Sequence, residues 1–208
     1  MDGQGKKSCT AFEGNRCIAS GSIVEVAKIV KETVDRDGQG SVLIFDDFTS
    51  EMVEVDFRGT MEDVLKRLEK PKKSISLVES AIEPPNTDQS SKRRPGRPKL
   101  GVVSREVTLL PRHWDWLNCQ PGGASVALRK LVEEARRVNS DRDRVRHSQE
   151  VAYRFMSAMA GNLPGFEEAT RALFAGNLER FENLITSWPG DIRDHARKLA
   201  APAFQKKR

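Results

Sequence analysis

The sequence predicts an α+β module at the N-terminus followed by a mainly α-helical half. Three observations lead to this prediction. Residues 8–70 mix short apolar runs, turn residues and helical spacing, which is typical of a small sheet packed with helices. A polar, proline-bearing stretch without periodicity then occupies residues 82–101. In residues 148–201, the apolar side chains recur only at helical spacing.

The N-terminal module begins with a predicted β-hairpin. Gly14-Asn15 separates two short segments, residues 10–13 and 16–19, and is a two-residue turn signal because it tolerates positive φ. Ser22 and Glu25 form a capping-box pattern, so we expect a helix to start directly after the second strand. The apolar positions of this helix keep helical spacing: Ile23, Val26, Ala27, Val30 and Val34.

Two further strands and a helix complete the predicted module. Residues 42–45 form an apolar run, and residues 53–57 alternate apolar with polar side chains, as in a strand with one wet face. Thr60 caps a second helix. The order of strands and helices predicts a β-grasp-like roll. Acidic residues in the turn between these two strands either cap the turn or bind a cation: Asp46, Asp47 and Glu51.

Positive charge is concentrated in the middle of the chain. The net charge is +5, yet residues 84–147 hold 14 basic and 7 acidic residues, while residues 1–83 are net negative. In the run 92–99, five of eight residues are basic. Such a local concentration is expected of a protein that binds a polyanion such as DNA. We expect residues 82–101 to be a disordered linker that carries this basic run, and the alternative to DNA binding is that the basic run is only solvated.

The basic run contains Gly96-Arg97-Pro98, which resembles the core of the AT-hook, an arm that lies in the minor groove of A·T-rich DNA. The resemblance implies that Arg97 enters the narrow, negative groove while Gly96 lets the backbone approach its floor. Pro95 stands where the family places an arginine, so a second deep contact does not follow. The predicted DNA-binding residues of this arm are Lys92, Arg93, Arg94, Gly96, Arg97, Pro98 and Lys99.

Residues 102–138 predict one strand and two helices. Residues 105–110 form the strand, Pro111 suits the first helical position, and Gly122-Gly123 precedes a second helix that Ser125 caps. This order resembles the ribbon-helix-helix fold, in which two chains pair their strands and insert the ribbon into the major groove. The resemblance implies a homodimer, and the alternative is a plain helical hairpin. The implied DNA contacts are Arg105, Thr108 and, through backbone N–H groups, Ser125.

The last segment, residues 148–201, predicts a four-helix module. Apolar stripes are interrupted by turn signals at Gly161, Gly176-Asn177 and Pro189-Gly190. Short helices with tight connections pack into a compact unit. We expect that these helices can hold a small molecule or a protein partner.

Other classes of protein are not expected. The longest apolar run, residues 42–45, is too short to span a membrane, and no secretory signal follows the first lysines. Three cysteines at unrelated spacings are typical of a protein of the reducing cytoplasm. His113 and Cys119 lie on different faces of a helix, and the histidines stand far apart. We therefore expect no metal site, no cofactor and no enzymatic activity.

Over almost its whole length the chain is similar to an uncharacterised bacterial family known only as a domain of unknown function, number twenty-two thirty-nine. The similarity is strongest in Arg97–Gly101, Val107–Leu117, Pro121–Ser125 and Ala152–Met156. This family supplies no established activity, so the expected function depends on the residues themselves.

Two functions remain open. The first is a regulatory or architectural protein that binds DNA, A·T-rich by preference, through the basic arm and the segment 102–138. The second is a cytoplasmic adaptor or ligand-binding protein whose basic segment only increases solubility. Loss of DNA binding at moderate salt in an Arg97→Ala variant distinguishes them, because binding at low salt is common to many basic chains.

Overall fold

The computed structural model describes residues 8–37, 41–69 and 105–205 of the chain. It divides into two compact units, one formed by Met1–Pro71 with Arg136–Arg208 and the other by Lys72–Ala135. The first unit opens with a small antiparallel sheet, and the C-terminal half of the chain is mostly helical. The predicted α+β and mainly α fold classes are therefore confirmed.

The predicted hairpin and the first helix are confirmed. Strands β1 (Ser8–Glu13) and β2 (Arg16–Ser22) pair antiparallel, and Gly14 in the turn has a φ of 54°. Helix α1 (Ile23–Asp37) follows the predicted capping box, in which the Ser22 N–H donates to Glu25 Oε2 at 2.9 Å. Strand β3 (Val42–Asp46) pairs with β1, which makes the strand order β2-β1-β3.

The fourth strand, predicted over residues 53–57, does not form. The Val53 N–H donates to Ile44 O at 2.7 Å, but residues 53–57 then leave the sheet without a ladder. Their alternation is nevertheless real, because Val53, Val55 and Phe57 are partly buried against the core beside α1 while the residues between them are exposed. An extended loop with one buried face produces the same pattern as a strand. The sheet thus has three strands where the predicted roll needs four.

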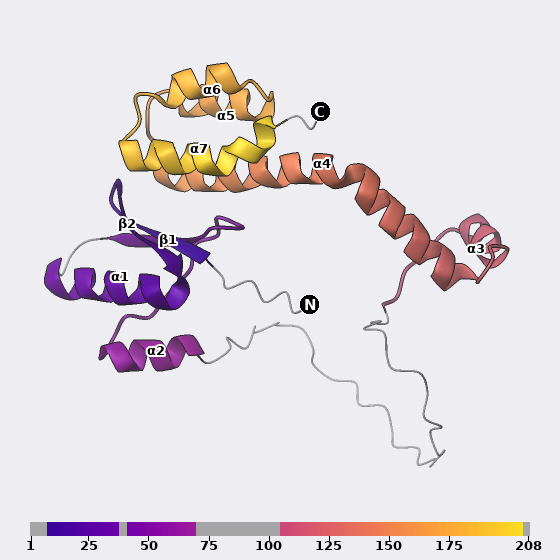
Figure 1. Ribbon diagram of the computed structural model, residues 1–208, viewed down its shortest axis with the longest axis horizontal. Helices are drawn as coiled ribbons and strands as arrows, with labels where there is room; N and C mark the ends of the chain where they lie inside the picture. Colours follow the sequence, from indigo (N-terminus) through magenta and orange to yellow (C-terminus); the bar gives the residue numbers. More distant parts are fainter. Residues whose placement is uncertain (1–7, 38–40, 70–104, 206–208) are drawn as a thin grey trace, which may run out of the picture. The chain divides into compact units, whose positions relative to one another are not determined.

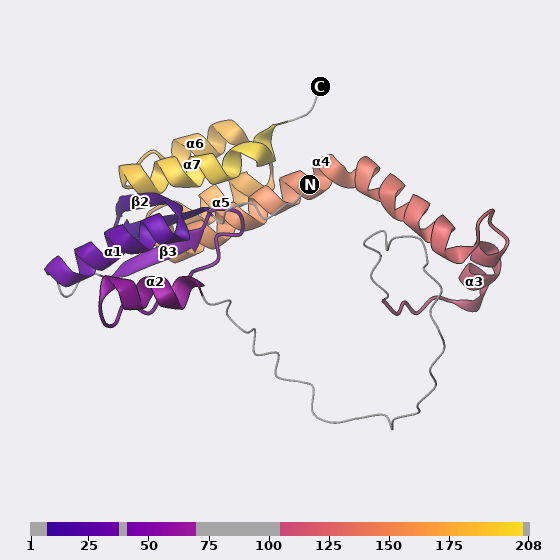
Figure 2. The same cartoon turned by 60° about the horizontal axis from the view of Figure 1, so that its bottom comes forward.

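Both faces of the sheet are covered, and the central strand β1 is buried along most of its length. On one face, Cys9 and Ala11 pack against α1, which contributes Val26 and Val30. On the other face, Phe12 and its neighbours meet the C-terminal helices. Figures 1 and 2 show the sheet between α1 and these helices. Helix α2 (Met61–Glu69) begins after Thr60, whose N–H donates to Asp63 Oδ2 at 3.0 Å, so the predicted cap is confirmed.

The four predicted C-terminal helices are present, but the first is longer than expected. It is the end of α4 (Ala124–Ala160), a helix of 37 residues that also includes the charged stretch 139–147. The others are α5 (Phe166–Phe174), α6 (Leu178–Ile185) and α7 (Gly190–Phe204), separated by the predicted turns. A charged stretch on an exposed helix face has no apolar stripe, so the sequence pattern does not distinguish it from a loop. The apolar stripe therefore does not show where such a helix starts.

The N-terminal sheet and the C-terminal helices share one hydrophobic core. Phe155 of α4 lies 5.3 Å from the ring centroids of both Phe12 and Phe45, and 4.5 Å from His195 of α7. All three phenylalanines are fully buried. The described parts of residues 8–70 and 148–201, which the sequence presents as separate modules, therefore pack as one body.

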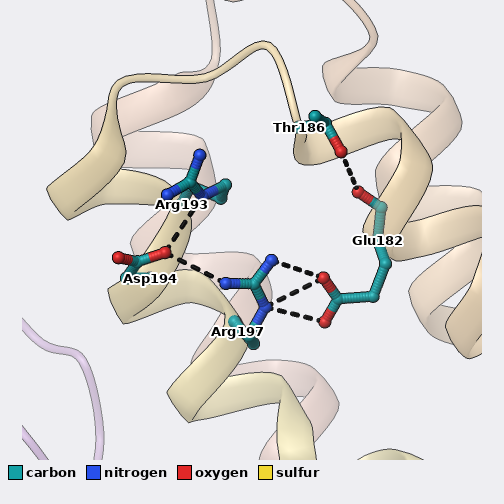
Figure 3. Close-up of polar contacts among 5 residues, drawn as sticks. All are labelled: Glu182, Thr186, Arg193, Asp194 and Arg197. Carbon is teal, nitrogen blue, oxygen red and sulfur yellow. Dashed lines mark hydrogen bonds and ion pairs between the residues drawn. The ribbon is translucent and has the colours of Figure 1, made fainter.

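Polar contacts on the surface join α6 to α7 (Figure 3). Arg197 donates to both carboxylate oxygens of Glu182, at 2.9 Å from Nε to Oε1 and 2.6 Å from Nη2 to Oε2. Its Nη1 also reaches Asp194, which accepts from Arg193. An exposed ion pair contributes most to stability when it has this planar, bidentate geometry.

Candidate nucleic-acid interface

Most of the predicted DNA-binding residues lie outside the described part of the chain. These are Lys92, Arg93, Arg94, Gly96, Arg97, Pro98 and Lys99. The described residues of the second unit are 105–135. They include three of the predicted contacts: Arg105, Thr108 and Ser125.

The predicted strand at residues 105–110 is not formed in the single chain. Arg105 and Thr108 are both exposed, and no strand is present between residues 105 and 110. A lone strand needs the backbone of a second strand to complete its hydrogen bonds. Nothing within residues 105–135 supplies one, because the rest of this stretch is a helix pair with its turn.

The first helix of this unit begins where the sequence predicts. Helix α3 (Pro111–Asn118) has Leu110 at its N-cap with extended backbone, and Pro111 at the first helical position, where its missing N–H costs nothing. The following turn contains Gly122 and Gly123, with φ values of 86° and 74°. A Cβ on Gly122 would lie 3.2 Å from the Val126 side chain, so this turn requires glycine for both φ and space.

The prediction that Ser125 caps this helix is wrong. Helix α4 already starts at Ala124, and the carbonyl of Gly123 accepts from the N–H groups of Val126 and Ala127 at 3.1 Å each. Ser125 is thus inside the first turn and exposed, and its own carbonyl accepts from Arg129 Nε at 3.1 Å. Gly123, which can adopt positive φ, takes the capping position two residues before the predicted Ser125.

The α3–α4 pair leaves much of its apolar surface uncovered. Within residues 105–135, Leu117 and Ala127 are the buried hydrophobic side chains. Trp116 is 53% exposed, and Leu131 is 48% exposed. Between the helices is a cleft of about 280 Å³, lined by Leu109, His113, Trp116, Leu117, Leu128 and Leu131. We call this surface the α3–α4 cleft. An apolar surface of this kind is typical of a protein interface.

The segment that forms the cleft is neutral, although the charge of the whole middle region, residues 84–147, is strongly positive. Residues 105–135 hold four basic and four acidic residues. The five basic residues of the arm precede this neutral segment, and residues 136–147 follow it with five arginines against two aspartates. The helix pair therefore carries no net charge of its own, and the positive charge lies in the segments on either side.

Arginines of α4 also border a second pocket, in the first unit, which sequence reasoning missed. This pocket has a volume of about 540 Å³ and is lined by Asp141, Arg142, Arg144, Val145, Arg146, Gln149, Ala203 and Gln205. Arg144 donates to Pro202 O at 2.9 Å and to Gln205 O at 3.0 Å, which satisfies carbonyls at the C-terminal end of α7. The spacing of Arg142 and Arg146, one helical turn apart, was the available signal.

Two titratable groups of the first unit, His195 and Asp46, have structural roles. His195 is buried between Phe12 and Phe155, and this burial lowers its pKa from the ordinary 6.5 to about 4, with a smaller contribution from Lys198. Asp46 Oδ1 accepts from the N–H groups of Phe48 and Thr49. Of the two roles predicted for the acidic residues of this turn, Asp46 thus has the capping role. Among the described residues no group of three or more His, Cys, Asp or Glu side chains is arranged to hold a metal ion.

No helix in the described parts of the chain is both long and apolar enough to cross a membrane. No curated protein and no solved structure matches the chain. The model of a family described as "Uncharacterized protein conserved in bacteria (DUF2239)" matches residues 8–200. This match covers nearly all of both units, including the arm and the α3–α4 cleft. The chain therefore belongs to the DUF2239 family of bacterial proteins.

Proposed function

We propose that the protein is a cytoplasmic, non-enzymatic DNA-binding protein, regulatory or architectural, that needs no cofactor. The arm around Gly96-Arg97-Pro98 contacts the minor groove of A·T-rich DNA, with Arg97 as the residue that reads groove width. A homodimer formed through residues 102–138 presents two such arms to one duplex. The distribution of charge supports this proposal, because a dense basic segment directly precedes a neutral helix pair.

The observation that carries the dimer is the exposed apolar surface of the α3–α4 cleft. Two buried side chains, Leu117 and Ala127, are too few to stabilise an isolated unit of this size. A second copy offers the same apolar cleft and the same unpaired segment 105–110, so a two-fold arrangement lets the two surfaces cover each other and the two segments pair. In this ribbon-helix-helix-like arrangement Arg105 and Thr108 face the major groove.

The test of DNA binding compares two single substitutions in the arm. Lys92→Ala removes a phosphate contact, so it should weaken binding to all duplexes alike and reduce the slope of log affinity against log salt by about one. Arg97→Ala should reduce the preference for A·T-rich over G·C-rich duplex. Fluorescence anisotropy with matched labelled duplexes at moderate salt measures both. Equal loss on the two duplexes for Arg97→Ala would indicate simple charge attraction, and no loss would reject the arm as a DNA contact.

The test of the dimer places a charge in the cleft. Leu131→Glu is tolerated in a monomer because the side chain is half exposed, but in a dimer it buries a carboxylate, so the dimer should dissociate to monomers. Ile29→Glu on α1, where the side chain is 42% exposed, is the matched control and should leave the mass unchanged. Sedimentation equilibrium measures the masses. A monomeric wild-type chain at tens of micromolar would reject the dimer.

The adaptor function is supported by the same cleft. An uncharged apolar surface can also take a helix of a different protein, and the cleft is lined along both of its helices by apolar side chains. A monomeric chain that does not bind duplex DNA at moderate salt would favour the adaptor over the DNA-binding protein.

A further inference from the structure

We propose that the first unit carries a separate site for single-stranded nucleic acid. The site is a strip formed by Arg142, Arg146 and Tyr153 of α4 with Phe174 of α5, and we call it the arginine–aromatic strip. It is distinct from the arm and from the α3–α4 cleft, since all of its residues belong to the first unit. Such sites combine arginines, which bind the phosphates of the nucleic acid, with exposed aromatic rings, on which its bases stack.

The first step is the helical register of α4. Positions 142, 146, 149 and 153 follow one another at intervals of three or four residues, so they lie along one face of the helix. At 1.5 Å per residue, Arg142 and Tyr153 are separated by about 16 Å along the axis. The strip is therefore long enough for a short run of nucleotides and too long for a single phosphate.

The second step concerns the arginines that border the pocket of about 540 Å³. Arg142 is exposed, and its side chain has no hydrogen-bond or ion-pair partner among the described residues. Arg146 contacts Asp143 at 2.8 Å, but its side chain remains 70% exposed. Arg144 is occupied by the end of α7 and pairs weakly with Asp141 at 3.9 Å. Arg142 and the accessible side of Arg146 are thus available to phosphates.

The third step concerns the aromatic rings. Tyr153 and Phe174 are 43% and 51% exposed, and their ring centroids lie 5.9 Å apart with an interplanar angle of 61°. Gln149 connects them to the pocket, because it lines the pocket and its Nε2 donates to Leu173 O at 3.1 Å. Two exposed aromatic rings beside a cationic pocket present faces on which unpaired bases can stack. Base faces are accessible in a single strand and covered in a duplex, so single-stranded nucleic acid fits this strip.

The first experiment uses the fact that Tyr153 is the only tyrosine of the chain. Full-length protein labelled with 3-fluorotyrosine has one ¹⁹F resonance, which reports on this ring alone. The probe is an oligothymidylate of about twelve nucleotides, within the site size of known single-strand binders. Titration should shift the resonance in a saturable way. A resonance that stays unchanged while anisotropy shows the probe to be bound would overturn the proposal.

The second experiment compares variants of the full chain by anisotropy with the same oligothymidylate. Loss of one stacking partner in Tyr153→Leu should weaken binding about five- to one-hundredfold, and Tyr153→Phe should stay within about twofold because the ring is kept. Arg142→Gln should reduce the salt slope by about 0.7. The matched controls, Phe48→Leu and Arg16→Gln, remove an exposed ring and an exposed arginine elsewhere in the first unit and should change neither quantity. Equal effects of the strip and control variants would overturn the proposal.

The arm also attracts single strands through charge, so each measurement is repeated in a full chain whose arm lysines and arginines are replaced by glutamine. The Tyr153→Leu effect should persist in this background, since the strip does not depend on the arm. Binding of A·T-rich duplex should fall with the arm substitutions and not with Tyr153→Leu. This pattern separates failure of the strip from failure of the proposed arm. Disappearance of the Tyr153→Leu effect in the neutral-arm background would overturn the strip as a site.

Discussion

The first unit and the α3–α4 pair differ most in how they bury apolar side chains. In the first unit, phenylalanines from the sheet and from α4 meet in one core with every ring fully buried. In the described part of the second unit, Leu117 and Ala127 are buried while Trp116, Leu131 and Val132 remain about half exposed. Apolar residues at helical spacing occur in both. The comparison teaches that the same sequence pattern can serve an internal core or a surface that awaits a partner.

The largest effect is expected in the shared core of the first unit. Phe155→Ala leaves a cavity between the sheet and α7, so the free energy of unfolding of this unit should fall by about 3 to 5 kcal/mol. Urea denaturation followed by circular dichroism measures the loss. Leu131→Ala in the cleft is the comparison variant and should leave the unfolding of the first unit unchanged. Equal losses for both variants would remove the distinction between the two regions.

The next effect concerns pH. Because the pKa of His195 is about 4 in the folded protein against 6.5 in the unfolded chain, the unfolded state binds more protons between these values. The contribution of His195 to stability should be constant above about pH 6.5 and should decrease by about 3 kcal/mol as the pH falls toward 4. His195→Leu should flatten this part of the stability curve, measured by urea denaturation at several pH values. An unchanged pH dependence in the variant would assign it to other groups.

A smaller effect is expected in hydrogen exchange, which should depend on protein concentration in the α3–α4 pair and not in the first unit. If the α3–α4 cleft is covered by a second copy, hydrogen-exchange protection of α3 should rise with protein concentration, by up to about tenfold for a tenfold increase. Amides of α5, which packs inside the first unit, should not respond. Concentration-independent protection of α3 would mean that the pair is stable without a partner.

The smallest effect is expected at the surface of the first unit. Arg197→Lys loses the bidentate contact with Glu182 and retains the charge, so the unfolding free energy should fall by less than about 1 kcal/mol. The difference should shrink at high salt, because the pair is partly exposed. Thermal denaturation at two salt concentrations measures it. A loss similar to that of Phe155→Ala would show that this ion pair, and not the core, holds α6 against α7.

Local signals in the sequence are sufficient to predict where many helices and turns begin. Gly14-Asn15, the Ser22–Glu25 capping box and Pro111 each act within a few residues, so the hairpin, α1 and α3 begin where they predict. The apolar stripes likewise identified α5, α6 and α7. The sequence does not reveal that the ring of Tyr153 is exposed on the same face of α4 as Arg142 and Arg146, because exposure depends on which neighbours cover a helix face.

Turns, caps and helical stripes are thus encoded by neighbours in the chain, whose energies do not depend on distant segments. The alternating residues 53–57 pack as a loop and not as a strand, because their pairing with β3 does not continue beyond the hydrogen bond from the Val53 N–H to Ile44 O. Residues 8–70 and 148–201 merge into one unit because burying both faces of a three-stranded sheet requires helices from elsewhere in the chain. Such choices depend on contacts between segments far apart in sequence, and only tertiary packing determines which of these contacts form.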